Sequence, residues 1–176
     1  IELSLQIDDI ELINIIANKL SINVYVSKTK TKDRARILFA CKDFFTRLEN
    51  LGITQKKSET MSLNMSAIKK EYLHHFIRGY FDGDGTIFYR TKNGVVTTNV
   101  EFAIVGNEDT IDKFHQYFYD NGIELNLHKD IAPNVSFKFC RIKTGVQKDI
   151  VKIKELLYNN ANYFLSRKYE KMPSGD

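Results

Sequence analysis

Two carboxylates, Asp82 and Asp84, end an apolar stretch with helical spacing, and a strand-like run begins directly after Gly85. The last carbonyl groups of a helix have no intrahelical partners, and negative charge there does not complement the helix dipole. Local stability therefore does not explain these two acids. A hard divalent cation does, because such ions are held by carboxylates together with water and substrate phosphates.

Two other interpretations of these acids are weaker. The stretch starts like an EF-hand calcium loop, but counting from Asp82 places Ile87 where that loop needs glycine and Asn93 where it needs glutamate. The four histidines show no two-histidine metal spacing with an acid. A plain helix-ending turn remains as an alternative, and the hairpin that follows disfavours it.

The element that positions the acids is a predicted helix over residues 68–81, with Ser66 as its N-cap. Gly79 and Gly83 lie four residues apart, on one face of a helix. Small residues on one face let a second backbone approach closely. We therefore expect this face to pack against another helix.

A hairpin is predicted after the helix, because Asn93-Gly94 lies between two alternating runs. Pairing outward from this turn sets Arg90 opposite Thr97, Phe88 opposite Asn99 and Thr86 opposite Glu101. One face of the hairpin is mainly apolar and the other is rich in hydrogen-bonding groups, which is typical of a sheet that lies on helices and meets a partner on its polar side. Our candidates for contacts with that partner are Arg90, Lys92, Thr97 and Asn99, and for a DNA partner Arg90 is the best match to guanine.

Positive charge is concentrated in one short segment of the chain. Cations occur at every second position at Lys28, Lys30, Lys32, Arg34 and Arg36. With Asp33 this segment carries +4, which equals the net charge of the whole chain. Period-two cations share one face of an extended strand and suit contacts with phosphates, although a solvated hairpin tip is the plain alternative. A second cationic set is predicted on the return strand of a later hairpin: Lys138, Arg141 and Lys143.

Composition limits the class of protein. The chain has 176 residues, of which 43% are hydrophobic and 12% aromatic, enough for one domain or two small ones with packed cores. Cys41 and Cys140 fit neither a disulfide framework nor a zinc site, so we expect a reducing intracellular compartment, the cytoplasm or an organelle. We expect no membrane partner and no small-molecule cofactor.

The chain repeats one order of elements: strand, capped helix, hairpin, helix and basic tail. Residues 3–7 match 100–104, residues 39–42 align with 138–141, and residues 54–59 match 165–170. The shared order predicts an internal duplication. We expect a first repeat over 1–64 that lacks its motif helix and first hairpin, and a complete second repeat over 65–176.

The stretch IRGYFDGDG over residues 77–85 resembles the LAGLIDADG motif of homing endonucleases. It matches at Gly79, Asp82, Asp84 and Gly85. It departs at Arg78, where a small residue is usual, and Gly83 replaces an alanine. The resemblance spans essentially the whole chain. It implies an α+β fold of α/β repeats, a pseudo-two-fold pair of αββαββα units whose saddle-shaped antiparallel sheets straddle DNA.

The resemblance also implies a function, the site-specific hydrolysis of double-stranded DNA with a divalent cation such as Mg²⁺. In that family the last acid of the motif binds the metal, which assigns Asp84, while Asp82 supports the helix end. Lys57 and Lys168 correspond to basic residues around the attacking water. The partner of the Gly79 face would be a second motif helix, from a segment upstream of this sequence or from another chain. The alternatives are a catalytically inactive DNA-binding regulator, an RNA splicing maturase, or a protein–protein module. The host element (intron, intein or free-standing gene) is left open.

Overall fold

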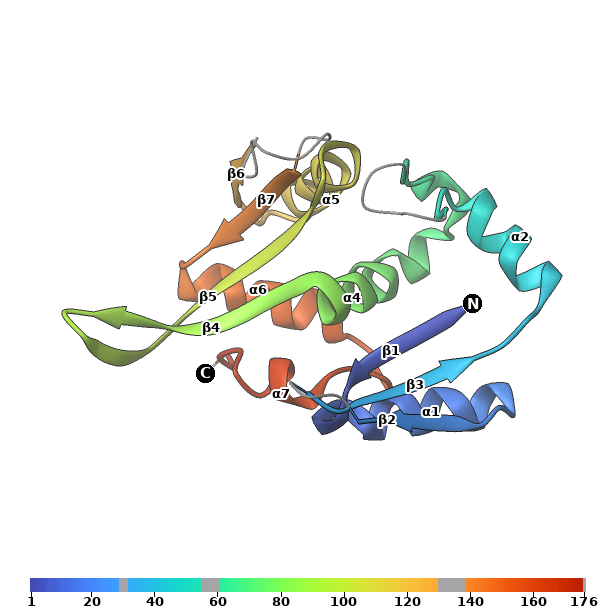
Figure 1. Cartoon of the computed structure of the whole chain (residues 1–176). Coiled ribbons are helices and arrows are strands. Elements are labelled where there is room, and N and C mark those ends of the chain that lie inside the picture. The colour runs from blue at the N-terminus through green and yellow to red at the C-terminus, as the bar shows by residue number, and fades with distance from the viewer. Residues whose placement is uncertain (29–31, 55–60, 130–138, 176) are drawn as a thin grey trace.

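The computed structural model describes residues 1–28, 32–54, 61–129 and 139–175 (Figure 1). The first part of the chain contains β1 (Glu2–Gln6), the 3-10 turn η1 (Ile7–Asp9), α1 (Ile10–Leu20), β2 (Val24–Ser27), β3 (Arg34–Leu38) and α2 (Lys42–Asn50). The 3-10 turns η2 (Met65–Ala67) and η3 (Lys70–Tyr72) lead to α4 (Leu73–Asp84). Then come β4 (Gly85–Lys92), β5 (Val95–Asn107), α5 (Glu108–Asp120), β6 (Asn126–His128), β7 (Phe139–Thr144), α6 (Gln147–Tyr158) and α7 (Ser166–Tyr169).

The strands form two antiparallel sheets. The N-terminal sheet has the order β1-β3-β2, and the C-terminal sheet has the order β4-β5-β7-β6. In Figure 1 the N-terminal sheet and α1 lie at the lower right, and the C-terminal sheet lies at the left with α4 toward the centre. Strands β5, β7 and β6 are joined in the same spatial order as β1, β3 and β2. This order agrees with a duplication, while the division near residue 64 stays a prediction.

Alternation along β3 separates the core from the charged face of the N-terminal sheet. Ala35 and Ile37 are buried and pack with Ile13 and Ala17 of α1. Arg34 and Arg36 therefore lie together on the opposite face, because successive side chains of a strand point to opposite sides. The predicted shared strand face is confirmed for Arg34 and Arg36 only, because Lys28 and Lys32 lie outside β2 and β3. Lys30 falls outside the described residues.

A larger aromatic core lies between the C-terminal sheet and its helices. Phe81 of α4 stacks on Phe102 of β5 with ring centroids 4.7 Å apart, and Phe102 meets Phe118 of α5 edge to face at 6.0 Å. Ile153 and Leu157 of α6 join the same core. The two cores share no residue among those described.

The helix that carries the two acids begins later than predicted. The backbone is extended at Ile68 (φ −95°, ψ 125°), so α4 starts at Leu73. Ser66 lies in η2, where its hydroxyl donates to Asn64 Oδ1 at 2.7 Å. The prediction of Ser66 as N-cap was wrong, because an extended residue separates it from the helix.

The hairpin turn at Asn93-Gly94 is confirmed, with φ of 51° and 80° at its two residues. A register shift between Tyr89 and Thr91 then changes the pairing, so that Phe88 faces Glu101 and Thr86 faces Ala103. The predicted pairs Phe88–Asn99 and Thr86–Glu101 were wrong. The shift is by two residues, and an even shift leaves each side chain on its predicted face.

Local signals further along the chain were reliable. Asn107 caps α5, and its Oδ1 accepts the Thr110 amide at 3.0 Å. The sequence predicts Asn107 as the cap of this helix and Ile111, Phe114 and Phe118 as its inward residues, and all three apolar side chains are buried. Cys41 and Cys140 are both free thiols. In the part of the chain that the structure describes, no helix is long and apolar enough to cross a bilayer.

Candidate active site

The last turn of α4 directs its two acids to different environments. Asp84 is exposed, whereas Asp82 is only 8% exposed and its Oδ2 accepts the Leu165 amide at 3.2 Å. Burial raises the pKa of Asp82 to about 6, against the opposing effects of the Leu165 amide and the Lys168 and Arg78 charges. The Asp82 carboxylate therefore points into the protein interior, and Asp84 is the acid that a ligand can reach.

The ammonium of Lys168 closes the same helix end. Its Nζ donates to the carbonyl oxygens of Phe81, Asp82 and Gly85 at 2.6, 2.8 and 2.6 Å. It also lies 4.8 Å from the centre of the Phe81 ring. Burial lowers the pKa of Lys168 to about 8. A lysine ammonium has three donors, so this geometry engages its full capacity with carbonyl groups at the end of α4 and the start of β4.

The opposite side of α4 is open. A Cβ built at Gly79 or Gly83 would meet no heavy atom of the described residues within 4 Å. Beside Gly79, a groove is lined by Ile53, Met61, His75, Phe76 and Tyr80. The exposed face of α4 thus consists of two glycines and Asp84, flanked by apolar side chains.

Arg78 occupies the buried side of α4. Its Nη1 donates to Leu157 O at 3.0 Å and its Nε to Tyr163 O at 3.3 Å, and it contacts His75 Nδ1. Burial lowers the pKa of Arg78, and the charge of Asp82 opposes this effect. An arginine fits at this position because its side chain extends toward the end of α6, away from the two glycines.

Comparison with known proteins agrees with this geometry. The family model of a LAGLIDADG-like domain matches residues 71–159, just over half of the chain. The chain belongs to the LAGLIDADG family. Among curated proteins, none matches the chain.

Solved structures of LAGLIDADG homing endonucleases have the same fold. I-GzeII in complex with its DNA target gives a TM-score of 0.61 at 12% identity, over 97% of this chain and 76% of that one. I-SmaMI bound to uncleaveable DNA gives 0.58 at 13% identity, over 97% and 75%. Mesophilic variants of I-DmoI give 0.55 at 12% identity, over 90% and 79%. The predicted LAGLIDADG homing-endonuclease fold is confirmed.

Three neighbours of Asp84 in this LAGLIDADG chain were not singled out from the sequence. A small cavity beside Asp84 is lined in part by Tyr80, Gly106 and Asn107. The Tyr80 hydroxyl donates to Val105 O at 3.2 Å, and burial together with the Asp84 charge raises the pKa of Tyr80. A Cβ at Gly106 would lie 2.4 Å from this hydroxyl. The spacing of four between Tyr80 and Asp84 was the available signal, whereas Gly106 and Asn107 come from a distant strand.

The donor atoms at Asp84 suit a hard cation but form only part of a site. The described residues contain no group of three or more His, Cys, Asp or Glu side chains arranged to hold a metal. One exposed carboxylate fits Mg²⁺, which takes one or two carboxylates and completes its shell with water and phosphate. Asp84 can therefore supply one carboxylate ligand to such an ion.

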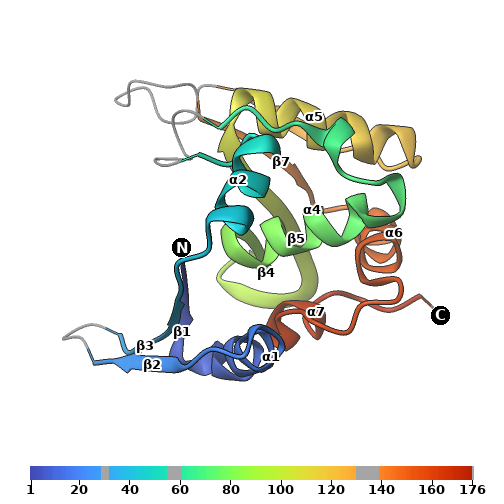
Figure 2. The same cartoon turned by 90° about the vertical axis from the view of Figure 1, so that its right-hand side faces the viewer.

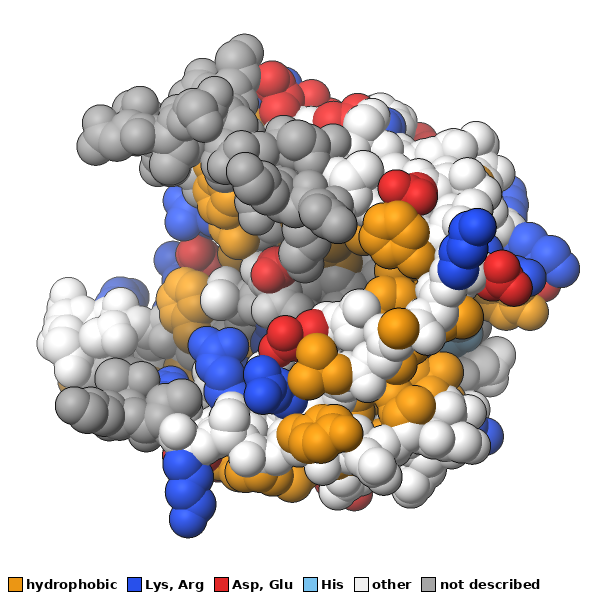
Figure 3. Space-filling model, turned by 45° about the vertical axis from the view of Figure 1, so that its right-hand side comes forward, with side chains coloured by type: hydrophobic (Ala, Val, Ile, Leu, Met, Phe, Trp, Pro, Cys, Tyr) orange, Lys and Arg blue, Asp and Glu red, His pale blue; other side chains and the backbone are white. Residues whose placement is uncertain are grey.

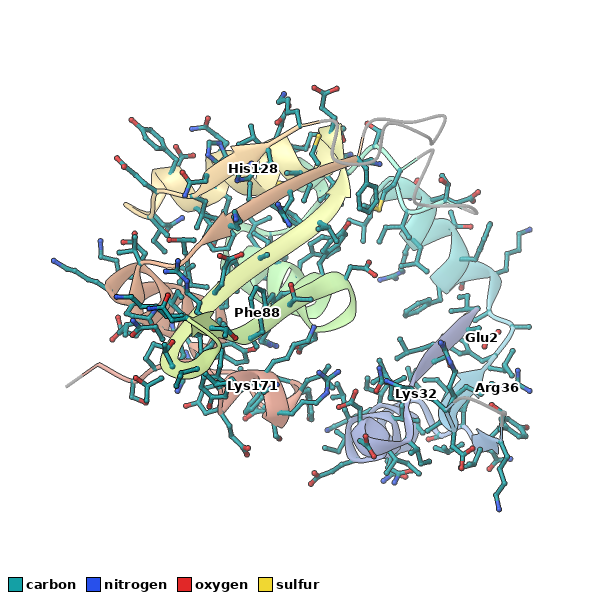
Figure 4. The ribbon with its side chains drawn as sticks, turned by 60° about the vertical axis from the view of Figure 1, so that its left-hand side comes forward. Glu2, Lys32, Arg36, Phe88, His128 and Lys171 are labelled. Carbon is teal, nitrogen blue, oxygen red and sulfur yellow. The ribbon has the colours of Figure 1, made fainter. Side chains whose placement is uncertain are left out.

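The described residues of the predicted DNA-contacting set lie in two separate parts of the structure, and Lys28 and Lys32 are outside the strands of either sheet. Figure 4 shows Glu2, Lys32 and Arg36 in the N-terminal part, apart from Phe88 and His128 on the C-terminal sheet. Arg36 Nη1 lies 3.9 Å from Glu2 Oε1, and Lys143 Nζ lies 3.5 Å from Glu101 Oε1. The exposed residues of this set are Lys28, Lys32, Arg34, Arg90, Lys92 and Asn99, and the half-buried ones are Arg36, Thr97, Arg141 and Lys143. Lys57 and Lys138, like Lys30, fall outside the described residues.

The side chain of Arg90, in β4, lies close to Gly145, which follows β7. A Cβ at Gly145 would lie 3.0 Å from Arg90 Nη1. The hydroxyl of Thr97 donates to Arg90 O at 2.9 Å. On the face shown in Figure 3, acidic and basic side chains lie next to each other in a central recess. The arrangement combines exposed cations on two sheets with one exposed acid at the end of α4.

Proposed function

We propose that this protein is a site-specific, metal-dependent DNA endonuclease in which Asp84 holds a divalent cation, Mg²⁺ or a similar ion. One observation supports this above the others: Asp84 is exposed beside the open Gly79–Gly83 face, while Asp82 is turned inward. A solved I-DmoI variant was studied with nicked target DNA in the presence of Mn, which supports a divalent cation in this family.

The chemistry of phosphodiester hydrolysis explains the need for these groups. The reaction requires a positioned water and stabilisation of charge on the attacking and leaving oxygens, which a bound divalent cation supplies. In our proposal Asp84 anchors the cation, and Asp82 and Lys168 hold the helix end that carries Asp84. Lys57 is proposed to act around the attacking water. Double-stranded DNA would lie across the polar faces of both sheets, with its phosphates near Arg34, Arg36, Arg141 and Lys143.

A second motif helix is the proposed occupant of the Gly79–Gly83 face. It would come from another segment of the protein or from another chain, and it would bring the second acid of the site. Two glycines spaced by four allow close approach of backbones, and the groove beside Gly79 offers apolar contacts. Closing this face would place two acids near one another at the centre of the DNA.

Substituting alanine for Gly79 and Gly83 tests that packing. Because neither new Cβ meets a described neighbour and alanine favours helix, each variant should be more stable by about 0.5–1 kcal/mol in urea unfolding. The pair should also weaken association with the second motif helix, as measured by sedimentation, and lower cleavage. Asn18→Ala on α1 is the matched control, with no expected effect on association. Wild-type association of the double variant would exclude this helix pairing.

The cationic segment predicts a salt-dependent interaction. Replacing Lys28, Lys30 and Lys32 with alanine should reduce the slope of log affinity against log salt by up to about 3, since each lost phosphate contact removes about 0.9. The control replaces Lys19, Lys148 and Lys152, which lie on α1 and α6. Titrations by fluorescence anisotropy at several salt concentrations measure the slope. An unchanged slope in the first variant would remove this segment from the DNA interface.

The second candidate function is binding without cleavage, as in a DNA-binding regulator or an RNA splicing maturase. The engagement of Lys168 with three carbonyls favours it, because that ammonium is not directed toward a substrate in this geometry. Selection of cleaved sites from a random DNA pool, with Mg²⁺ or with EDTA, distinguishes the two. Cleaved sequences recovered only with Mg²⁺ support the endonuclease, and none in either condition supports the binder. We also propose a reducing intracellular compartment, the cytoplasm or an organelle, and the two free thiols of Cys41 and Cys140 support this proposal.

A further inference from the structure

The orientation of the N-terminal sheet relative to α4 is not set by a common core. The cluster around Ile13, Ala17, Ala35 and Ile37 and the cluster around Phe81 and Phe102 share no residue among those described. A packed core resists rotation because side chains interdigitate. Two separate cores therefore depend on the contacts between them to hold one relative orientation.

One such contact lies where the chain passes from the first part to the second. Asn64 N donates to Leu51 O at 3.0 Å, and a Cβ at Gly52 would lie 1.8 Å from Ser62 O. This contact joins segments that are close in sequence. If this were the one contact between the two parts, the N-terminal sheet could rotate about it relative to α4.

A second contact joins the two ends of the described chain. Arg167 of α7 binds Asp9, at the start of α1, through two parallel hydrogen bonds of 2.8 and 2.9 Å. Figure 2 shows α1 lying beside α7. The Asp9 side chain is only 4% exposed, and the hydrogen bond of Arg167 raises the arginine pKa. A buried carboxylate needs this partner, because an unpaired buried charge is strongly unfavourable.

The same short segment binds the helix that carries Asp84. Lys168 follows Arg167 directly and closes the end of α4 through three carbonyls, and Leu165 N donates to Asp82. Residues 165–168 thus contact the N-terminal part on one side and the last turn of α4 on the other. Two parallel hydrogen bonds join the Arg167 guanidinium to the Asp9 carboxylate, so they restrain the relative rotation of the two groups as well as the distance between them.

We propose that residues 165–168 form a joint that sets the orientation of the N-terminal sheet relative to Asp84, with Arg167 as a positioning residue. The consequence for DNA rests on the function proposed above: the joint determines how many base pairs separate the DNA held by the N-terminal sheet from the bond that is cut. Arg167 itself need not touch the DNA. Spacing selectivity would then be controlled far from the base-contacting strands.

The first test measures orientation without DNA. Spin labels are attached to cysteines introduced by Ser4→Cys in β1 and Asn126→Cys in β6, in a Cys41→Ser background. Pulsed electron paramagnetic resonance then measures the distance between the two sheets. The protein with Arg167 and Asp9 intact should give one narrow distance distribution, and Arg167→Ala and Asp9→Asn should broaden it. Arg167→Lys, which keeps the charge but not the fork, should be intermediate, and Arg47→Ala on α2 should have no effect. An unchanged narrow distribution in Arg167→Ala overturns the proposal.

A charge-exchanged variant covers the case in which Arg167→Ala does not fold. Asp9→Arg combined with Arg167→Asp restores an ion pair with reversed polarity. Circular dichroism establishes folding, and a narrower distance distribution than that of either single exchange is expected. If the double exchange is folded and as broad as the single exchanges, the ion pair does not set the orientation.

The second test measures spacing selectivity on a DNA target obtained by selection. One base pair is inserted between the part contacted by the N-terminal sheet and the cut position. The insertion should lower cleavage by the unmutated protein by at least about tenfold, the scale of one mismatched base pair. Arg167→Ala should cleave both targets at closer rates, a change that a general loss of stability would not produce. Equal discrimination by both proteins counts against the joint, whereas absence of cleavage of any DNA counts against the proposed function and leaves the distance measurement valid.

Discussion

Replacing Asp84 with asparagine is expected to abolish DNA cleavage in Mg²⁺ and to leave DNA affinity nearly unchanged. Asp84 is exposed at the end of α4, so its amide substitute keeps the shape and removes the negative charge that a cation needs. Loss of residues that merely support a metal ligand costs about 10- to 100-fold, so loss of the proposed ligand should cost more than about 100-fold in rate. Single-turnover cleavage of a selected target, with the second motif helix present, measures this effect.

Asp43→Asn is the matched control for Asp84→Asn. Asp43 is also an exposed acid, in the first turn of α2, and lies outside the last turn of α4. It should cleave and bind like the unmutated protein. Nicking by Asp84→Asn at an unchanged rate would remove Asp84 from the site. If Asp84→Asn is folded but binds DNA much more weakly than the unmutated protein, Asp84 contributes to DNA binding instead of to cleavage.

Replacing Lys168 with methionine is expected to destabilise the protein by on the order of 3 kcal/mol, because three buried carbonyls lose a charged donor while the apolar stem is kept. For a chain of this length that corresponds to a fall in Tm of roughly 6–12 °C. Thermal unfolding followed by circular dichroism measures the shift. The half-buried Lys171, three residues further on (Figure 4), provides the control Lys171→Met, with little expected change.

The same variant tests the role that family resemblance predicts for Lys168. Cleavage is measured at a temperature at which both proteins are folded. If Lys168 acts only by closing the end of α4, the Lys168→Met protein should be less stable and should keep part of its cleavage activity. Lost cleavage with an unchanged Tm would show that Lys168 acts at the attacking water and that the contacts with Phe81, Asp82 and Gly85 are not decisive.

Features set by neighbouring residues were predictable from the sequence. The turn at Asn93-Gly94, the Asn107 cap and the burial of Phe114 and Phe118 depend on spacings of two to four residues. The residues of the LAGLIDADG motif were also recognisable, because their types and order lie within one short stretch. These signals do not need the rest of the chain.

Features set by contacts between distant segments were not predictable in this way. The start of α4, and the register between β4 and β5 from Gly85 to Tyr89, depend on backbone geometry that the residue types do not reveal. Gly106 and Asn107 come to the Asp84 cavity from β5, and nothing near Asp84 in the sequence indicates them. The pairing of Asp9 with Arg167 joins residues 158 apart in the chain.

Residue types and their spacing are enough to place two acids and two glycines in the last two turns of one helix. Tertiary packing turns Asp82 inward, leaves Asp84 facing solvent and brings Lys168 to the end of the helix. These different environments arise because Leu165 and Lys168, more than 80 residues away, bury one carboxylate and leave the other exposed. Residue type makes metal binding possible, and packing selects the acid that a cation can reach.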